Sequence, residues 1–306
     1  MFRKFRLHFL AVIAVISLIS ILNPKVFAAP LDLTITPTTA NIVINPGSIN
    51  KGSLQVINQG SSAYDFQVYT NPYSVTGENY TPDFTVLPNK PNPSSWFQLS
   101  SSGSHANPGQ TYNINYTITV PKSTQPGGYY AVIFAETKNP SSVANSVSLN
   151  ERVGELFYMQ VAGPVVQKGS LLTWQSSFFQ KPPLIATLRL ENSGGLHYMS
   201  TINYHISDIL GQNKYSLYTQ KIVLPDTIRR IQLPWNNTPS IGIFKVNGNV
   251  NFLGQTHNLP TTYVFVMSET IRLFTLLVLV VIIFIFLVRI VYRQIKHRRN
   301  VKKAQK

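Results

Sequence analysis

The 306-residue chain contains no cysteine. This absence excludes thiol catalysis, thiolate metal sites and the disulfide-pinned immunoglobulin domains of vertebrates. A chain without disulfides outside a cell depends on its hydrophobic cores, and domains of about 100 residues or more are large enough for that. The composition therefore favours a bacterial surface, particularly one of the Gram-positive type.

Acidic residues are scarce, because 11 Asp and Glu stand against 26 Lys and Arg. The basic surplus is uneven: eight of these residues lie in 289–306, which holds no acid, and three lie among the first six positions. Positions 30–268 hold 13 basic and 10 acidic residues and are nearly neutral. This region lacks the basic surface that nucleic acid requires, so we predict no nucleic-acid partner.

Catalytic signatures are also lacking. The sequence has no G-x-S-x-G elbow, phosphate loop or calcium loop, and its six histidines show no zinc-ligand spacing. Glu151 and Glu155 are expected to form a solvated pair of charges on one face of a strand. We predict a protein that is not an enzyme and that holds no cofactor or metal. A glycan hydrolase is the alternative, and it would need two carboxylates within about 10 Å in a cleft.

Two long apolar runs mark the ends of the chain. The first, 7–22, follows Arg3, Lys4 and Arg6 and predicts a secretory signal over 1–29. Its small residues place the predicted cleavage between Ala28 and Ala29, and an uncleaved signal anchor is the alternative.

The second apolar run, 270–291, is long enough to cross a bilayer as a helix. We expect Arg272, Arg289 and Arg293 to anchor it at the two membrane interfaces. The basic tail 292–306 is predicted to be cytoplasmic by the positive-inside rule. The expected product is a single-pass cell-membrane protein with extracellular N-terminal domains.

Period-two alternation dominates the region between these runs. In 112–120, tyrosines, isoleucines and a valine alternate with Asn and Thr, as in a strand with one buried face. About seven such strands, separated by turn residues, fall in 30–166 and about seven more in 167–268. The sequence predicts an all-β fold: two tandem immunoglobulin-like β-sandwiches plus one C-terminal transmembrane helix.

One stretch, 71–95, breaks this rhythm with tyrosines among five prolines. Loops at the end of a sandwich often bind ligands, and aromatic side chains suit sugar rings or partner chains. Tyr73, Tyr80, Phe84 and Trp96 are the candidate binding residues, although for Trp96 the favoured interpretation is a core strand that begins with Trp96 and Phe97. Arg229 and Arg230 are expected on opposite strand faces, one covering apolar surface and the other solvated.

Several turns carry a family resemblance. Asn107-Pro108-Gly109-Gln110 and Pro126-Gly127-Gly128-Tyr129-Tyr130 resemble the N-terminal domain of bacterial WxL-interacting surface proteins. Glu191-Asn192-Ser193-Gly194-Gly195-Leu196-His197 is similar to the N-[ST]-G-x-x-H turn of the membrane-proximal sandwich in that architecture. We expect Gly127, Gly128, Asn192, Gly194, Gly195 and His197 to have structural roles in these turns.

The resemblance implies peptidoglycan binding by the first domain and binding of other surface proteins by the second. The hypothesis is a membrane-anchored bacterial surface binding protein whose partners are the membrane, peptidoglycan or another cell-surface protein. The alternative is a structural scaffold or chaperone-like assembly protein for a co-expressed surface partner. Such a protein would act by strand addition at an open sheet edge.

Overall fold

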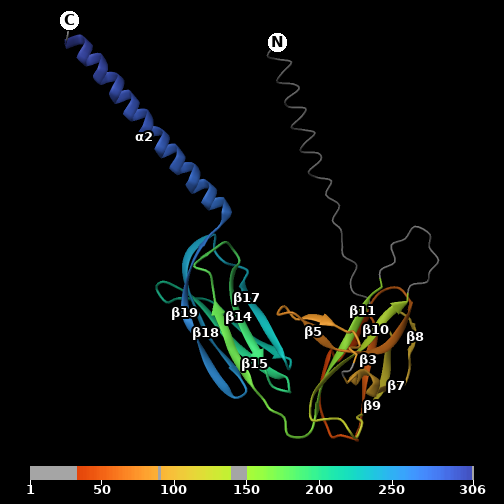
Figure 1. Ribbon diagram of the computed structural model, residues 1–306. Helices are drawn as coiled ribbons and strands as arrows, with labels where there is room; N and C mark the ends of the chain where they lie inside the picture. Colours follow the sequence, from red (N-terminus) through yellow and green to blue (C-terminus); the bar gives the residue numbers. More distant parts are fainter. Residues whose placement is uncertain (1–32, 89–90, 139–149, 305–306) are drawn as a thin grey trace, which may run out of the picture.

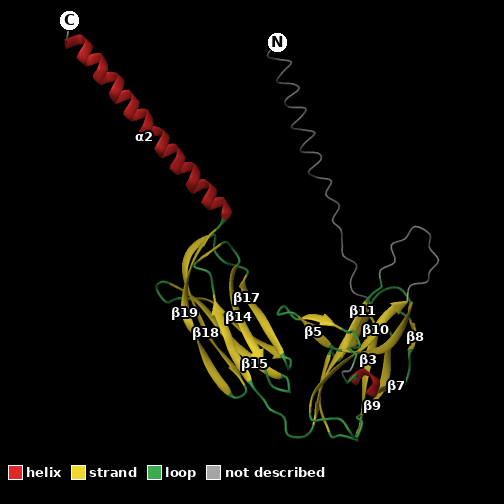
Figure 2. Ribbon diagram, viewed as in Figure 1, coloured by secondary structure: helices red, strands yellow, loops and turns green. Residues whose placement is uncertain are grey.

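The computed structural model of the chain describes residues 33–88, 91–138 and 150–304. Two β-sandwiches follow one another and lead into a single long helix (Figures 1 and 2). The all-β immunoglobulin-like prediction is thereby confirmed. The predicted signal sequence, with Ala28 and Ala29, lies outside the described residues.

The first sandwich has a four-stranded and a five-stranded sheet. The smaller sheet runs in the order β1 (Leu33–Thr36), β3 (Ile49–Asn58), β9 (Thr111–Thr119) and β7 (Phe97–Leu99). The larger sheet runs in the order β2 (Thr39–Ile44), β11 (Arg152–Val161), β10 (Gly127–Lys138), β4 (Tyr64–Pro72) and β8 (Gly103–Ala106). Between β4 and β8 the chain adds the hairpin β5 (Ser74–Thr76)–β6 (Thr81–Asp83), the 3₁₀ turn η1 (Pro93–Trp96) and β7.

The second sandwich repeats this plan with fewer additions. One sheet has the order β12 (Gly169–Gln175), β14 (Leu184–Asn192) and β17 (Thr227–Trp235). The other has the order β13 (Phe179–Gln180), β19 (Gln255–Met267), β18 (Ile241–Phe252), β15 (Tyr198–Asp208) and β16 (Asn213–Val223). In each domain, one parallel pair stands among antiparallel ones: β2 with β11 and β13 with β19.

Alternation builds both cores as predicted. In β9, Ile114, Tyr116 and Ile118 are buried, and in β14 every second residue from Leu184 to Asn192 is buried. Each apolar face packs against the facing sheet, so each domain has its own core cluster. Burial of these faces is the main stabilising contribution to each sandwich.

One side chain contradicts its prediction. Glu155 lies on the inward face of β11, in line with the core residues Phe157 and Met159, and its exposed fraction is 0%. Neither carboxyl oxygen has a hydrogen-bond partner among the described residues. Strand alternation fixes this orientation, because Glu155 shares the parity of its apolar neighbours. The expected solvated pair with Glu151 is therefore wrong.

A single residue, Ser268, separates β19 from the helix α2 (Glu269–Ala304). The segment Glu269–Arg293 is apolar and long enough to cross a membrane, and none of its most apolar stretch is buried by the protein. Arg272, Arg289 and Arg293 are exposed on this helix. The helix continues beyond position 291 into the basic segment.

Candidate functional site

The two turns that carry the family resemblance meet across the boundary between the domains. The backbone N–H of Gly128 donates to the carbonyl of Gly195 over 2.9 Å. A Cβ added at Gly127 would stand 3.3 Å from that same oxygen, and Gly127 has a φ of +152°. Glycine is required at Gly127 by its φ, and the close approach of the Gly195 carbonyl leaves little room for a side chain.

His197 lies in an aromatic cluster at this boundary. The Tyr130 hydroxyl accepts from the His197 backbone N–H and lies 3.1 Å from His197 Nδ1. The imidazole also packs against Tyr158, with ring centroids 5.4 Å apart. Burial lowers the pKa of His197, which favours the neutral imidazole at this boundary. The predicted structural role of His197 thus extends to the domain boundary.

The tip of the β5–β6 hairpin forms a second contact with the membrane-proximal domain. Glu78 accepts from Arg189 Nε over 2.8 Å and from Arg230 Nη2 over 3.0 Å, and it also contacts Arg189 Nη2. The Arg230 backbone N–H donates to the Glu78 carbonyl. The hydrogen bond from Arg189 holds the pKa of Glu78 below its ordinary value. The hairpin therefore covers part of the β17 edge with charge-assisted bonds.

Tyr80 completes this contact. Its hydroxyl accepts from the Leu224 N–H over 2.9 Å and bonds to Thr227 Oγ1, which donates to the Leu224 carbonyl. The Arg229 guanidinium lies 4.3 Å from the Tyr80 ring centroid, within the range of a cation–π contact. The two arginines lie on opposite faces and Arg230 is exposed, as expected, but both also bind the hairpin, which the sequence does not predict.

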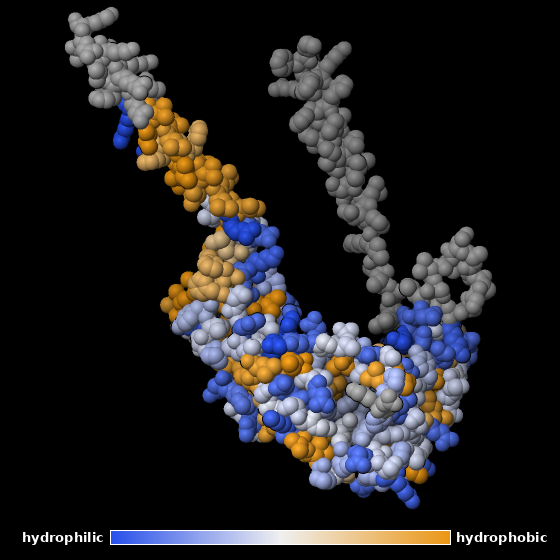
Figure 3. All heavy atoms as spheres, viewed as in Figure 1, coloured by the Kyte–Doolittle hydropathy of each residue, from blue (hydrophilic) through white to orange (hydrophobic). Residues whose placement is uncertain are grey.

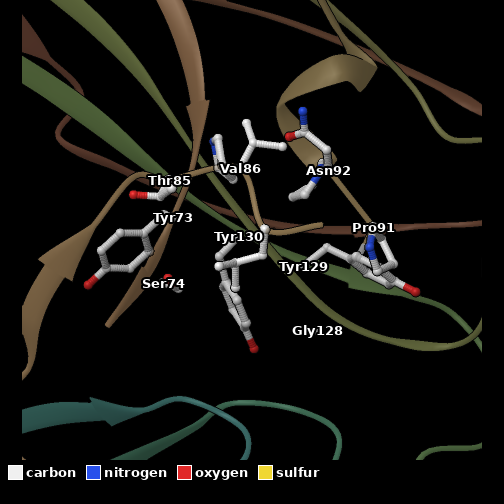
Figure 4. Close-up of a pocket in the computed structure, with 12 residues that line it drawn as sticks. Tyr73, Ser74, Thr85, Val86, Pro91, Asn92, Gly128, Tyr129 and Tyr130 are labelled. Carbon is white, nitrogen blue, oxygen red and sulfur yellow. The ribbon is translucent and has the colours of Figure 1, made fainter. Parts of the chain in front are cut away.

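A pocket of about 210 Å³ lies beside this boundary in the first domain (Figure 4). Tyr73, Tyr129 and Tyr130 supply ring surface, and Val86 and Asn92 lie across from Tyr130 in Figure 4. None of the residues that line the pocket is charged: they are Pro72, Tyr73, Ser74, Thr85, Val86, Leu87, Pro91, Asn92, Pro93, Gly128, Tyr129 and Tyr130. The pocket is smaller than typical drug-sized sites, so it accepts about one ring at a time.

The structure does not bring the four predicted binding aromatics together in one site. Tyr73 lines the pocket, whereas Tyr80 lies half-buried against the second domain. Phe84 packs edge-on against Phe134 at a centroid distance of 4.9 Å. Trp96 is 8% exposed and belongs to the first core, which is the favoured interpretation for this residue.

Sequence reasoning missed Glu78, Tyr129, Tyr130 and Val86 as site residues. The Gly-Gly-Tyr-Tyr motif contained a signal, since two adjacent tyrosines on a strand point to opposite sides of a sheet. Glu78 and Val86 lie in irregular segments, where spacing does not report which neighbour a side chain meets. Among residues 33–88, 91–138 and 150–304, no cluster of three or more His, Asp or Glu could hold a metal.

Comparison with known proteins yields structural neighbours alone. No family model and no curated protein matches the chain. The class 5 fimbriae chaperone CfaA is 13% identical, covers 76% of this chain and 98% of its own, and has a TM-score of 0.38. The E. coli chaperone DraB is 15% identical, and the match covers 76% of this chain and 96% of DraB with a TM-score of 0.37. The matching chain of the CsuC–CsuE chaperone–tip adhesion subunit pre-assembly complex of Acinetobacter baumannii is 12% identical. The match covers 78% of this chain and 100% of the other, with a TM-score of 0.39. Scores this low support no conclusion about function.

Proposed function

We propose that the protein is a membrane-anchored surface binding protein whose first-domain pocket takes an uncharged sugar unit of the cell-wall glycan. The observation that carries this proposal is the pocket lining, which combines tyrosine ring surface with Asn, Ser and Thr and has no charged side chain. Sugar rings present C–H groups to aromatic surfaces and hydroxyls to such polar groups. The resemblance of the turns to WxL-interacting proteins favours the same ligand class.

The position of the pocket supports this assignment. Its lining includes Gly128, Tyr129 and Tyr130 at the start of β10, and the same segment is hydrogen-bonded to the second domain. A site on a rigid strand is held more precisely than one on a free loop. Tyr129 is fixed in turn by a bond from its hydroxyl to the Gln125 carbonyl and by contact with Trp96 at 4.9 Å.

The test is co-sedimentation of the full chain, in detergent micelles, with purified Gram-positive peptidoglycan. Val86→Glu places a carboxylate in the pocket at an exposed position, and Val43→Glu places the same group on the β2 edge. We expect most of the Val86→Glu variant to stay in the supernatant, and we expect the Val43→Glu variant to sediment like the parent chain. Equal binding by the two variants would exclude the pocket as the binding site. No binding by the parent chain would exclude cell-wall binding as the function.

A second candidate function rests on a different feature, the edge strand β16. It has 11 residues, pairs with β15 on one side and ends the order of its sheet. An edge of this length can accept a strand from another chain. Lys214 and Lys221 on the strand oppose unspecific pairing, so we infer a selective surface-protein partner.

Proline substitution tests this candidate. A peptide or subunit that adds to β16 should lose binding when Thr219→Pro and Gln220→Pro are introduced one at a time, because adjacent residues of a strand direct their N–H groups to opposite sides and one of the two must therefore face outward. Gln220 is exposed on β16 and Thr219 is half-buried. Partner binding that survives both variants, in a chain that still folds by circular dichroism, would exclude strand addition at this edge.

A further inference from the structure

Exposed apolar side chains of the second sandwich gather at the end next to α2. Ile241 begins β18 opposite Met267, the last residue of β19, and both Ile243 and Phe179 pair with Phe265. Ile209 and Leu210 join them, because β15 ends at Asp208 opposite Phe244. We call this set the membrane-proximal apolar face: Phe178, Phe179, Ile209, Leu210, Ile241 and Ile243.

These side chains are unusually exposed for their size. Leu210 is 81% exposed and Phe179 is 71% exposed. The opposite end of the same sheet is more polar, since the β18–β19 turn is flanked by Asn251, Gln255 and Thr256, although Met199 is exposed there too. Figure 3 shows a second apolar area on the β18–β19 side, beyond a polar band at the start of the helix. Contiguous exposed apolar surface of this kind marks a contact site.

The face lies close to the start of the membrane span. One residue separates β19 from α2, and Lys181 Nζ bonds to Glu269 Oε1 over 3.0 Å, which ties the Phe178–Phe179 segment to the first helical turn. A hollow of about 380 Å³ opens there, lined by Phe179, Gln180, Lys181, Phe265, Met267, Glu269 and Arg272. In Figure 1, the β15–β16 turn projects on the same side of the domain as β18 and β19.

The charges at this end also suit a lipid surface. The two acids present, Glu269 and Asp208, are each paired with a lysine, Lys181 and Lys214 respectively. Arg272 and Lys245 are additional cations at the same end, which leaves a basic excess beside the apolar residues. Apolar side chains ringed by lysine and arginine are typical of surfaces that lie in the lipid headgroup region.

We propose that the membrane-proximal apolar face inserts into the headgroup region of the bilayer that α2 spans. This proposal rests on the membrane span and not on the identity of the pocket ligand. The occupant is lipid, because the face begins where the helix enters the membrane, and a soluble partner would have to displace that bilayer. The contact would fix the tilt of the second sandwich, and through the domain boundary the position of the first.

The absence of cysteine in the sequence allows a unique nitroxide label at Leu210→Cys in the full chain. The turn is preserved, because the bonds to Asp208 Oδ1 come from the backbone N–H groups of Leu210 and Gln212. The protein is placed in nanodiscs of phosphatidylcholine and phosphatidylglycerol. Compared with the control Thr256→Cys, the label at 210 should collide less with a water-soluble nickel complex and more with oxygen.

Two results would overturn the proposal. One is equal nickel accessibility of the labels at 210 and 256 in a chain that is folded by circular dichroism. The other is strong dipolar coupling between labels at 210 in two chains, which would mean that a second copy covers this face. Val86→Glu should leave the depth of the label unchanged, so a failure of the wall-binding proposal is distinguishable from a failure of this one.

Discussion

The two sandwiches share a turn built in the same way, and its surroundings give that turn different roles. Asn58 Nδ2 donates to the carbonyls of Ser62 and Ala106, while its Oδ1 accepts from the Gly60 N–H. Asn192 Nδ2 donates to the carbonyls of Leu196 and Val223, while its Oδ1 accepts from the Gly194 N–H. Both asparagines are buried at the end of the third strand of their domain, β3 and β14 respectively.

The two turns differ in the residues that cover them. The residues after Asn58 are mostly exposed, whereas Gly194 and Leu196 are buried. The linker between the domains lies against the second turn: its Val166 and Lys168 carbonyls accept from the backbone N–H groups of Gly195 and Ser193. The Gly195 carbonyl in turn accepts from the Gly128 N–H of the first domain. The local geometry of the turn thus comes from asparagine, and its role in joining the domains comes from what lies against it.

The largest expected effect follows from removing these asparagines. Asn192→Ala leaves two carbonyls and one N–H without partners at a site covered by protein, so we expect a loss of about 3–5 kcal/mol in the free energy of unfolding. Asn58→Ala should cost less, because water reaches part of its turn. Chemical denaturation of the full chain in micelles measures the loss in free energy of unfolding for each variant. Equal losses would contradict the expected difference between the two turns.

The cores differ in their buried polar groups, and this difference predicts a pH effect. Burial raises the pKa of Glu155 from its ordinary 4.5 to about 7. In the second domain, the buried side-chain atoms without a hydrogen-bond partner among the described residues belong to Thr173, Tyr204 and His257, and none of them is a carboxylate. The folded first domain binds more protons than its unfolded chain between pH 4.5 and 7, so its stability falls as pH rises through this window.

Glu155→Gln tests that prediction. It should remove the pH dependence of the first domain between pH 4.5 and 7 and stabilise it at pH 8 by about 3 kcal/mol. Calorimetry that resolves the two domains would measure both changes. Unchanged melting of the first domain at pH 8 would mean that the carboxylate finds solvent or a cation in solution.

The hairpin contact gives a smaller effect. Tyr80→Phe keeps the ring over Arg229 but removes the hydroxyl that bonds to Leu224 and Thr227, so we expect a loss of about 1–2 kcal/mol in coupling between the domains. The observable is a wider separation of the two unfolding transitions. Tyr218→Phe, an exposed tyrosine on β16, serves as the control and should leave that separation unchanged.

The smallest effect concerns His197. Burial lowers its pKa, so the unfolded chain binds more protons and the stability of the boundary falls as pH drops below about 6.5. The Glu155→Gln background removes the opposing trend of the first core. In that background, His197→Phe keeps an aromatic ring beside Tyr158 and should abolish the remaining acid sensitivity of the domain coupling, measured by calorimetry at pH 7.5 and 5.5.

The repeating elements of the fold were predictable, because strand alternation is a local property. The alternation in 112–120 located β9, and paired glycines located the turn after Asn192. Short β1 and β8 are not predicted, since four residues cannot establish a period, whereas the start of β7 is predicted from the aromatic pair Trp96-Phe97.

The site was less predictable, because it depends on contacts distant in sequence. Glu78 meets Arg189 across 111 residues, and Tyr130 meets His197 across 67. No local pattern distinguishes the Tyr73 that lines the pocket from the Tyr80 that joins the domains. For Glu155, charge and alternation predict opposite environments: a carboxylate favours solvent, whereas its position in β11 places it among buried residues.

The short junction at Ser268 has a mechanical consequence. Its N–H donates to the Ser240 carbonyl, and its own carbonyl accepts from the Arg272 N–H, so the last strand and the helix share one continuous set of backbone bonds. Tension applied at the first domain would pass through the Glu78 and Tyr80 contacts into the second domain, and then along β19 into the helix. The long register of β18 with β19 would resist that pull in shear, with many bonds strained together. A ligand held by the distal pocket would thus transmit force to the bilayer through a stiff path.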